Sequence, residues 1–368
     1  MSSSSPSTSP GASGGPARAF LAHVKRAVDA RLCAHLTSAR RRAVEAAPAA
    51  DVIAGAIEEL VQRGGKRFRP ALLAAAWVAC GGTSMASSEP PLPEVVLDAG
   101  CAWEILQAYF LIHDDWMDGD ETRRGGPAVH VLLTTHHRDP HLGAASAVLA
   151  GDLACALAHR VILEADAPAE VVRAASLAFA RVHEEVVLGQ AIDLTLEAAD
   201  RAAVERMHAL KTGSYTVRGP LEIGAILARG SREAKAALDR YAAPLGVAFQ
   251  LRDDLLGTFG DASETGKPVG SDLRARKRTA LVIEAMARLG GDDAARFERL
   301  FAERSTPSDA DVRWAMGLLQ TCGARAAVEK RLAELVAEAR DAASHDALTG
   351  TGRALLVGFA ELLAARNV

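Results

Sequence analysis

Residues 104–126 read EILQAYFLIHDDWMDGDETRRGG, and this stretch decides how the chain is interpreted. An apolar segment with helical spacing runs directly into a group of aspartates. On a helix Asp114 and Asp118 are i and i+4, so both carboxylates project from one face, a turn apart. Such close like charges need a compensating cation, and carboxylates without Cys or His partners suit Mg²⁺. Both aspartates are therefore candidate metal ligands, next to Arg123 and Arg124, which suit a phosphorylated anion.

A second acidic stretch, FQLRDDLLGTFGD, covers residues 249–261 and contains Asp253 and Asp254. It also follows an apolar helical segment. A single Asp-Asp pair is often only part of a solvated helix face. Two pairs, each at the end of an apolar helix, favour metal binding, because acidic groups in apolar surroundings are costly unless a positive charge compensates them.

Two basic segments carry glycines. GGKRFRP, at residues 64–70, is either an ordinary basic loop or a cradle in which Lys66 and Arg69 bind a diphosphate. TGKPVGSDLRARKRT, at residues 265–279, places Lys267 and Lys277 at opposite ends of a flexible segment. Beside metal-binding carboxylates, such a segment is typical of a lid over a charged substrate.

The composition predicts an all-α protein. Hydrophobic residues make up 49% of the 368 residues but aromatic residues only 4%, and a core of Ala, Leu and Val favours packed helices. The net charge of −4 argues against a nucleic-acid partner. No apolar run reaches the length of about 18 residues that a membrane span needs. Five scattered cysteines without CxxC spacing indicate free thiols, so we expect a cytoplasmic protein.

The chain is expected to form one domain. Residues 1–16 are rich in Ser, Pro and Gly and predict a disordered tail, and residues 17–368 predict a single all-helical domain. Helical spacing and Gly/Pro breaks predict helices over 18–46, 50–62, 70–79, 94–118, 142–164, 168–196, 201–229, 233–258, 272–289 and 309–344.

Seven motifs in order make the chain resemble the trans-isoprenyl diphosphate synthases, the polyprenyl synthetase family. They are GGKRFRP, LIHDDWMDGDETRRG, LAGDLA (149–154), GQAIDL (189–194), KTGSY (211–215), FQLRDDLLGTFGD and GKPVGSDLRARKRT. The resemblance implies an all-helical fold around a deep central cavity, a homodimer, and condensation of isopentenyl diphosphate with an allylic diphosphate. It also implies a cluster of Mg²⁺ ions, three per active site.

The resemblance also assigns roles to single residues. The principal Mg²⁺ ligands would be Asp114, Asp118 and Asp253, with Asp115 and Asp254 in support. The allylic diphosphate would be held by Arg123, Lys211 and Lys267, and isopentenyl diphosphate by Lys66, Arg69, Gln107 and Arg124. Thr212 and Gln250 would line the point where the bond forms. The chain departs from many relatives at Gly257, where they carry a third aspartate, while Asp253 and Asp254 remain.

Product length depends on the residues four and five positions before the first aspartate, which are Phe110 and Tyr109. In the family, large rings here block the growing tail, and two adjacent rings favour farnesyl diphosphate (C15). The segment from Lys211 to Arg278 instead resembles geranylgeranyl diphosphate (C20) synthases. We therefore expect a C15 product, with C20 as the alternative.

Two other interpretations stay open. A class I terpene cyclase shares the first acidic motif and Mg²⁺, but it needs no isopentenyl diphosphate site, which argues against it given GGKRFRP. A non-catalytic subunit of a heteromeric prenyl synthase would keep the fold and lose aspartates, whereas the first motif here is complete.

Overall fold

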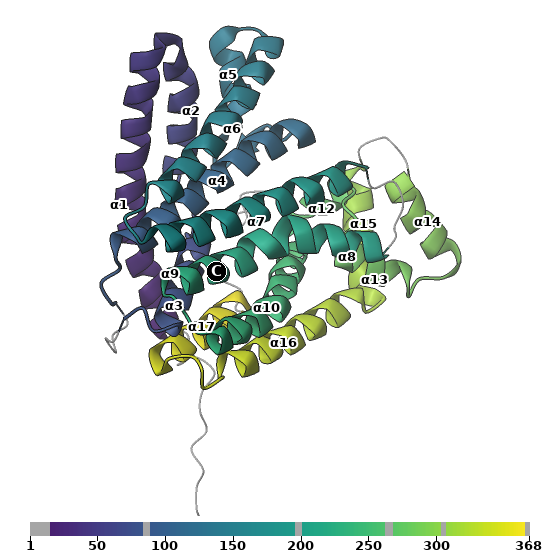
Figure 1. Ribbon diagram of the computed structural model, residues 1–368. Helices are drawn as coiled ribbons and strands as arrows, with labels where there is room; N and C mark the ends of the chain where they lie inside the picture. Colours follow the sequence, from purple (N-terminus) through teal and green to yellow (C-terminus); the bar gives the residue numbers. More distant parts are fainter. Residues whose placement is uncertain (1–14, 84–88, 196–200, 262–267, 303–306, 365–368) are drawn as a thin grey trace, which may run out of the picture. The chain divides into compact units, whose positions relative to one another are not determined.

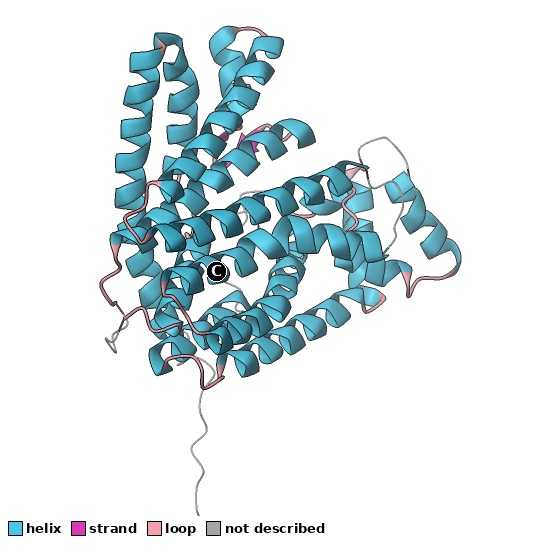
Figure 2. Cartoon of the chain, in the orientation of Figure 1, coloured by secondary structure: helices cyan, strands magenta, loops and turns pink. Residues whose placement is uncertain are grey.

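The computed structural model describes residues 15–83, 89–195, 201–261, 268–302 and 307–364. Almost all of the secondary structure in these ranges is helical, which confirms the predicted fold class (Figure 2). Of the predicted tail, only residues 15 and 16 are described, and they begin the first helix. The rest of the tail lies outside the described residues.

The described residues form two compact units. Three of the boundaries between them fall within helices α7, α10 and α17, and two fall between elements, after Arg218 and after Ser344. The first unit contains Met1–Arg181, Gly219–Leu238 and His345–Phe359. The second contains Val182–Arg218, Asp239–Ser344 and Ala360–Val368.

The elements up to residue 163 all belong to the first unit (Figure 1). They are α1 (Gly15–Ala46), the 3₁₀ turn η1 (Pro48–Ala50), α2 (Asp51–Gln62), α3 (Phe68–Ala79), α4 (Glu94–Asp118), strands β1 (Thr122–Arg123) and β2 (Gly126–Pro127), α5 (Val129–His137) and α6 (Pro140–Leu163).

Three further helices, α7 (Ala169–Thr195), α10 (Arg232–Phe259) and α17 (Gly350–Ala364), contribute residues to both units. Helix α9 (Gly219–Leu227) belongs to the first unit. The remaining elements belong to the second: α8 (Arg201–His208), the π-helix η2 (Ala209–Arg218), α12 (Ser271–Arg274), α13 (Ala280–Met286), α14 (Gly291–Ala302), α15 (Asp309–Thr321) and α16 (Ala324–Ala343).

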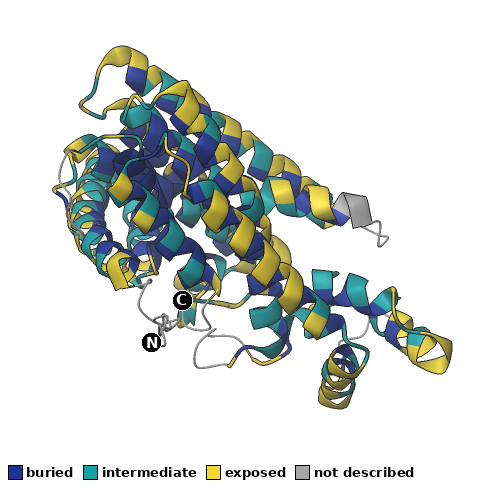
Figure 3. Ribbon diagram, turned by 90° about the horizontal axis from the view of Figure 1, so that it is seen from below, coloured by how far each residue is buried: buried dark blue, intermediate teal, exposed yellow. Residues whose placement is uncertain are grey.

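The core of the first unit is built around α3 and α4. Helix α4 packs against α3 and α6, and α9 packs against α3. Small residues allow the close approach: a side chain at Gly224 of α9 would meet the Leu73 carbonyl of α3 at 2.1 Å. Aromatic residues fill the wider gaps, as where Trp103 contacts Phe179 edge to face at 5.3 Å. Buried and exposed residues alternate along most helices (Figure 3), as amphipathic packing requires.

The core of the second unit is formed by α13, which packs against α14, α15 and α16. Phe297 of α14 contacts Trp314 of α15 at 6.3 Å. Helix α15 begins with a capping box, in which Ser308 and Asp311 exchange hydrogen bonds.

Helices α4 and α6 are long and apolar enough to cross a membrane by length and composition. However, 67% of the apolar window of α4 and 44% of that of α6 is buried inside the protein. Core helices of globular proteins pass the same test, so the two helices are weak evidence for a membrane span.

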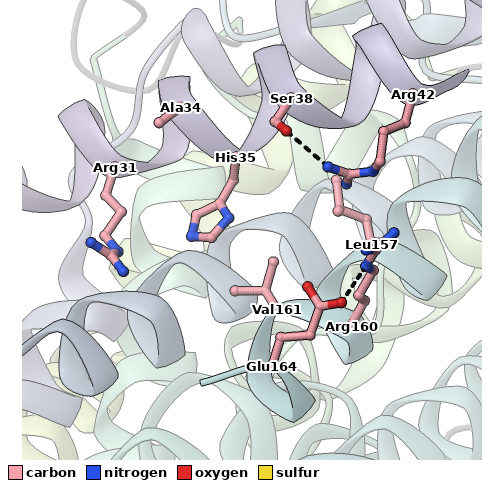
Figure 4. A pocket seen from close by; sticks show the side chains of 9 residues that line it. All are labelled: Arg31, Ala34, His35, Ser38, Arg42, Leu157, Arg160, Val161 and Glu164. Atoms are coloured by element: carbon pink, nitrogen blue, oxygen red, sulfur yellow. Dashed lines mark hydrogen bonds and ion pairs between the residues drawn. The ribbon is translucent and has the colours of Figure 1, made fainter. Parts of the chain in front are cut away.

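A cavity of about 390 Å³ lies between α1 and α6, within the first unit. Figure 4 shows its side chains facing one another, with Arg42 donating to Ser38 and Arg160 to Glu164. None of the site residues predicted from the sequence lines this cavity.

Candidate active site

The first acidic motif occupies the C-terminal end of α4. The helix ends at Asp118 because Gly119 adopts a left-handed conformation, with φ of 71°. Asp114 is half-buried, Asp115 is buried and Asp118 is exposed. Negative side chains at the C-terminal end of a helix oppose its dipole, in addition to repelling one another. This end of α4 therefore favours a bound cation.

Asp115 is held by the hairpin that follows α4. Arg123 on β1 donates to Asp115 from Nε at 2.8 Å and again from Nη2, and it contacts Asp120 at 3.1 Å. Burial raises the pKa of the Asp115 carboxyl, although hydrogen bonds from Arg123 oppose the change. Asp115 thus orients Arg123, while Asp114 and Asp118 lie nearer the solvent.

The hairpin is a two-residue turn that displays Arg124. Strands β1 and β2 pair in antiparallel fashion, with Thr122 opposite Pro127. Arg124 and Gly125 have positive φ values of 51° and 72°, which is the backbone of a type I′ turn. An arginine in this conformation is uncommon, and such strain is concentrated at functional sites.

The GGKRFRP loop lies against this hairpin. Arg63, at the end of α2, donates to the Pro127 carbonyl at 2.7 Å and to the Arg123 carbonyl at 3.2 Å. A side chain at Gly65 would lie 3.4 Å from Nη2 of Arg124. The structure therefore brings the basic loop and the two hairpin arginines together. In this loop Lys66 is exposed and Arg69, on α3, is half-buried.

The rings of Tyr109 and Phe110 contact each other on α4, with 5.0 Å between their centroids, but each has other neighbours of its own. Tyr109 contacts His113 at 4.8 Å between ring centroids, and His113 Nε2 lies 3.1 Å from the Val148 carbonyl of α6. Burial raises the pKa of Tyr109. Phe110 is four residues before Asp114 and three after Gln107, so these three residues share a different face of the helix.

The second acidic motif lies on α10 in the second unit, and its two aspartates differ. Asp253 is exposed, whereas Asp254 is buried. Asp254 accepts hydrogen bonds from Gln250 Nε2 at 2.7 Å and from the Ala280 N–H at 2.8 Å. Burial raises the pKa of Asp254 to about 6. Asp254 therefore orients Gln250 and the start of α13, and Asp253 is the member of the pair that lies open to solvent.

Gly257 has a specific neighbour that the sequence did not predict. A side chain at this position would meet Oδ2 of Asp272 at 2.0 Å, because α12 packs against α10 here. Ser271 also donates to the Gly257 carbonyl at 3.2 Å. The carboxylate of Asp272 thus occupies the space that a side chain at residue 257 would need.

Lys211 and Thr212 lie on the π-helix η2, a form of helix that is frequent at functional sites. Lys211 donates to Asp193 of α7 at 2.7 Å. The backbone of Lys211 passes close to Gly189, where a side chain would approach its N atom to 2.5 Å. Burial lowers the pKa of the neighbouring His208 to about 4, so its imidazole is neutral at pH 7.

The predicted residues therefore fall into two groups. In the first unit, contacts connect the Asp114–Asp118 turn, Arg123, Arg124 and the GGKRFRP loop. In the second unit, Lys211 and Thr212 lie on η2, and Gln250, Asp253 and Asp254 lie on α10. Lys277 is exposed. Lys267 lies outside the described residues.

The sequence interpretation missed two residues that hydrogen-bond to predicted site residues and a third that fills the space beside Gly257. They are Arg63, Asp193 and Asp272. Arg63 and Asp272 stand inside or beside motifs that were identified, and Asp193 belongs to GQAIDL. Their partners are distant in sequence, so only the fold reveals their roles.

Comparison with known proteins identifies the family of the chain. The family model of polyprenyl synthetases matches residues 50–319. The chain is 35% identical over 266 residues to the (2E,6E)-farnesyl diphosphate synthase of Mycobacterium tuberculosis, covering 71% of this chain and 68% of that one. It is 33% identical over 309 residues to the geranylgeranyl diphosphate synthase of the same organism, covering 82% and 80%.

Among solved structures, a geranylgeranyl pyrophosphate synthase from Corynebacterium glutamicum, complexed with isoprenyl diphosphate and magnesium, is similar with a TM-score of 0.85. It is 32% identical in sequence, and the match covers 94% of this chain and 99% of that one. By sequence motifs, fold and overall similarity, the chain belongs to the polyprenyl synthetase family.

Proposed function

We propose that the chain is a Mg²⁺-dependent prenyltransferase that joins isopentenyl diphosphate head-to-tail to dimethylallyl or geranyl diphosphate. The observation that carries the proposal is the set of contacts in the first unit. A turn of aspartates at the negative end of α4 is joined, through the Asp115–Arg123 pair, to a basic hairpin and a basic glycine loop. Carboxylates can bind Mg²⁺, and cations beside them can bind a diphosphate, so this arrangement suits an enzyme that acts on diphosphates.

The donor set fits Mg²⁺. Asp114, Asp118 and Asp253 offer carboxylate oxygens from half-buried or exposed positions, and neither Cys nor His belongs to this set. Asp115 and Asp254 support them from buried positions through Arg123 and Gln250. We propose three Mg²⁺ ions per active site. The chemistry that bound Mg²⁺ supplies is neutralisation of the charge that develops on the leaving diphosphate.

Cationic side chains orient the two substrates. Arg123, Lys211 and Lys267 bind the allylic diphosphate, and Lys66, Arg69, Gln107 and Arg124 bind isopentenyl diphosphate, with Lys277 as a further cation at the end of the 265–279 segment. Arg123 and Lys211 are each oriented by an aspartate, Asp115 and Asp193. A charge fixed in this way stabilises the developing anion without reorganising during the reaction.

The allylic C–O bond breaks, and its electron pair leaves with the diphosphate. The double bond of isopentenyl diphosphate then attacks the allylic cation, and a proton is lost to the departed diphosphate. Thr212 and Gln250 line the place where the new bond forms. Apolar residues of α4 exclude water from the cation.

Farnesyl diphosphate (C15) is the product we favour, and geranylgeranyl diphosphate (C20) is the alternative. Phe110 stands one turn from Asp114 on the same face of α4, where a ring limits the space below the metal ligands. The relatives include synthases named for either product. Our preference for a C15 product over C20 therefore rests on the rings of Tyr109 and Phe110.

The decisive experiment is mass spectrometry of the products that the purified chain forms from labelled isopentenyl diphosphate with each allylic starter. We expect label in a C15 product. Chelation of Mg²⁺ should stop incorporation, and added Mg²⁺ should restore it. Asp114→Asn should lower kcat about 100-fold or more. Asp239→Asn is the matched control, since Asp239 is an exposed aspartate on α10 outside the site.

A purified chain that ionises an allylic diphosphate but never incorporates the label would be a terpene cyclase. A chain that is inactive alone and active with a partner chain would be a subunit of a heteromeric synthase. Either result would overturn the proposal.

We also propose that the protein is a cytoplasmic homodimer. Leu142, Leu149 and Leu153 lie on one face of α6, with exposed fractions of 50%, 56% and 36%. A stripe of exposed leucines along one helix suits a self-complementary interface between two copies.

A further inference from the structure

Arg67 is the buried cation of the GGKRFRP loop. Only 4% of its surface is exposed, whereas Lys66 before it is exposed and Arg69 after it is half-buried. A buried arginine must have its donors satisfied, because an unpaired charge in the interior is costly. Arg67 therefore has a task different from that of the two cations beside it.

Each nitrogen of the Arg67 guanidinium donates to a different element. Nη1 donates to Glu104 of α4 at 2.5 Å, and Nε donates to Asp29 of α1 at 2.7 Å. Nη2 donates to the Val61 carbonyl near the end of α2 at 3.1 Å. Glu104 is itself buried, with 4% exposed. One side chain thus joins α1, α2 and α4 to the loop that starts α3.

The backbone of Arg67 has an unusual conformation. Its φ and ψ are 52° and 33°, the left-handed region that non-glycine residues rarely adopt. The residue also precedes the first turn of α3, and its carbonyl accepts from the Ala71 N–H at 3.1 Å. The contacts of the side chain hold this backbone, so they fix where the loop turns.

The pair also fixes two substrate-binding elements relative to each other. Arg67 lies between Lys66 and Arg69 in the loop, and Glu104 is three residues before Gln107 on α4, on the same side of the helix. The Arg67–Glu104 bond therefore sets the distance from the loop cations to Gln107.

We propose that Arg67 is a positioning residue for isopentenyl diphosphate, acting through Glu104 to hold Lys66 and Arg69 where they meet the diphosphate. This inference rests on the proposed function. Arg67 touches no substrate itself. Its loss affects binding of isopentenyl diphosphate and leaves binding of the allylic diphosphate, for which Arg123 and Lys211 are the cations, largely unchanged.

The test uses the double variant R67M/E104Q, which removes both buried charges and so leaves neither uncompensated. Asp29 keeps a partner in this variant, since Lys25 donates to it at 2.6 Å. We expect KM for isopentenyl diphosphate to rise about tenfold or more, with KM for the allylic diphosphate within about twofold, because small displacements of binding groups are costly.

A second ion pair between α1 and α4 provides a matched control. Arg31 of α1 donates to Asp98 of α4 at 2.5 and 2.7 Å, and Asp98 is 6% exposed. The variant R31M/D98N also removes an α1–α4 ion pair, so it reports the effect of lost stability alone. We expect it to leave both KM values unchanged. Equal rises of KM in the two double variants would overturn the proposal.

A second variant keeps the test decisive if R67M/E104Q does not fold. R67K retains the charge opposite Glu104, but an ammonium group cannot reproduce the three-way geometry of a guanidinium. It should raise KM for isopentenyl diphosphate about threefold or more, and an unchanged value would overturn the proposal.

Calorimetric titration with isopentenyl diphosphate separates this inference from the proposed function. If the wild-type protein does not bind the compound, the proposed function fails. If the wild type binds and a folded Arg67 variant binds equally well, only the role of Arg67 fails.

Discussion

Phe110 and Tyr109 are adjacent in sequence and their ring centroids lie 5.0 Å apart, but the two residues have different further neighbours along α4. Tyr109 belongs to the face on which His113 meets α6, whereas Phe110 shares its face with Gln107 and Asp114. We therefore expect Phe110→Ala to lengthen the product by one or more C5 units and Tyr109→Ala to have a smaller effect. Mass spectrometry of the products of each single variant measures this. If only Tyr109→Ala lengthens the product, then Tyr109, and not Phe110, limits the length of the tail.

Gly257 leads to a second prediction for a single residue. A third aspartate introduced here, Gly257→Asp, would place its Cβ 2.0 Å from Oδ2 of Asp272. The clash and the repulsion between two carboxylates should lower the free energy of unfolding by about 1–3 kcal/mol. Chemical denaturation measures it. Replacement of Asp272 by Ala in the same chain should recover part of the loss, and no recovery would show that another contact causes it.

At this scale the sequence predicted which residues carry charge but not how each is used. It identified both members of each Asp-Asp pair, because the acidic runs follow apolar helices. It did not show that the second member is buried each time, bonded to Arg123 in one pair and to Gln250 and Ala280 in the other. Those partners depend on the hairpin and on α13, which the periodicity of a single helix does not determine.

At the scale of the elements, His208, directly before the π-helix η2, makes the stability of the fold depend on pH. Burial lowers the pKa of His208 to about 4, below the ordinary value of 6.5. As the pH falls from 6.5 to 4, the unfolded chain binds a proton at this residue and the folded chain does not. The folded state therefore loses stability over this interval, by up to about 3 kcal/mol, and the loss is complete below pH 4.

Replacement of His208 by Gln isolates this contribution, because glutamine does not titrate. The free energy of unfolding of the wild type, relative to His208→Gln, should fall between pH 6.5 and 4 in urea denaturation. Parallel pH profiles for the two proteins would show that His208 is protonated as easily in the folded state as in the unfolded one.

The predicted helices were most accurate where apolar periodicity is long and uninterrupted. The helix expected over 94–118 has the same bounds in α4, and that expected over 233–258 corresponds to α10, Arg232–Phe259. The helix expected over 309–344 was wrong as one element, because Gly323, with φ of 80°, separates α15 from α16. The β1–β2 hairpin was missed, since two-residue strands leave no alternating pattern.

For the whole molecule, the all-α class could be predicted because an Ala- and Leu-rich chain with few aromatic residues packs best as helices. The organisation into two compact units could not. Three of the five boundaries between them fall inside the continuous helices α7, α10 and α17, and the other two follow Arg218 and Ser344. Units joined through continuous helices leave no linker in the sequence.

The oligomeric state is the property of the whole molecule that the leucine stripe of α6 makes testable. Each chain has a mass of 38.6 kDa, so the homodimer that we propose should elute with twice this mass in light scattering coupled to size exclusion. Leu149→Glu with Leu153→Glu places two charges in the proposed interface, where burying them is costly, and should shift the mass to that of one chain. Ala333→Glu, at an exposed position of α16, adds one negative charge away from the stripe and should leave the dimer intact. If the double variant remains a dimer, the copies meet through another surface, and the exposed leucines of α6 need a different partner.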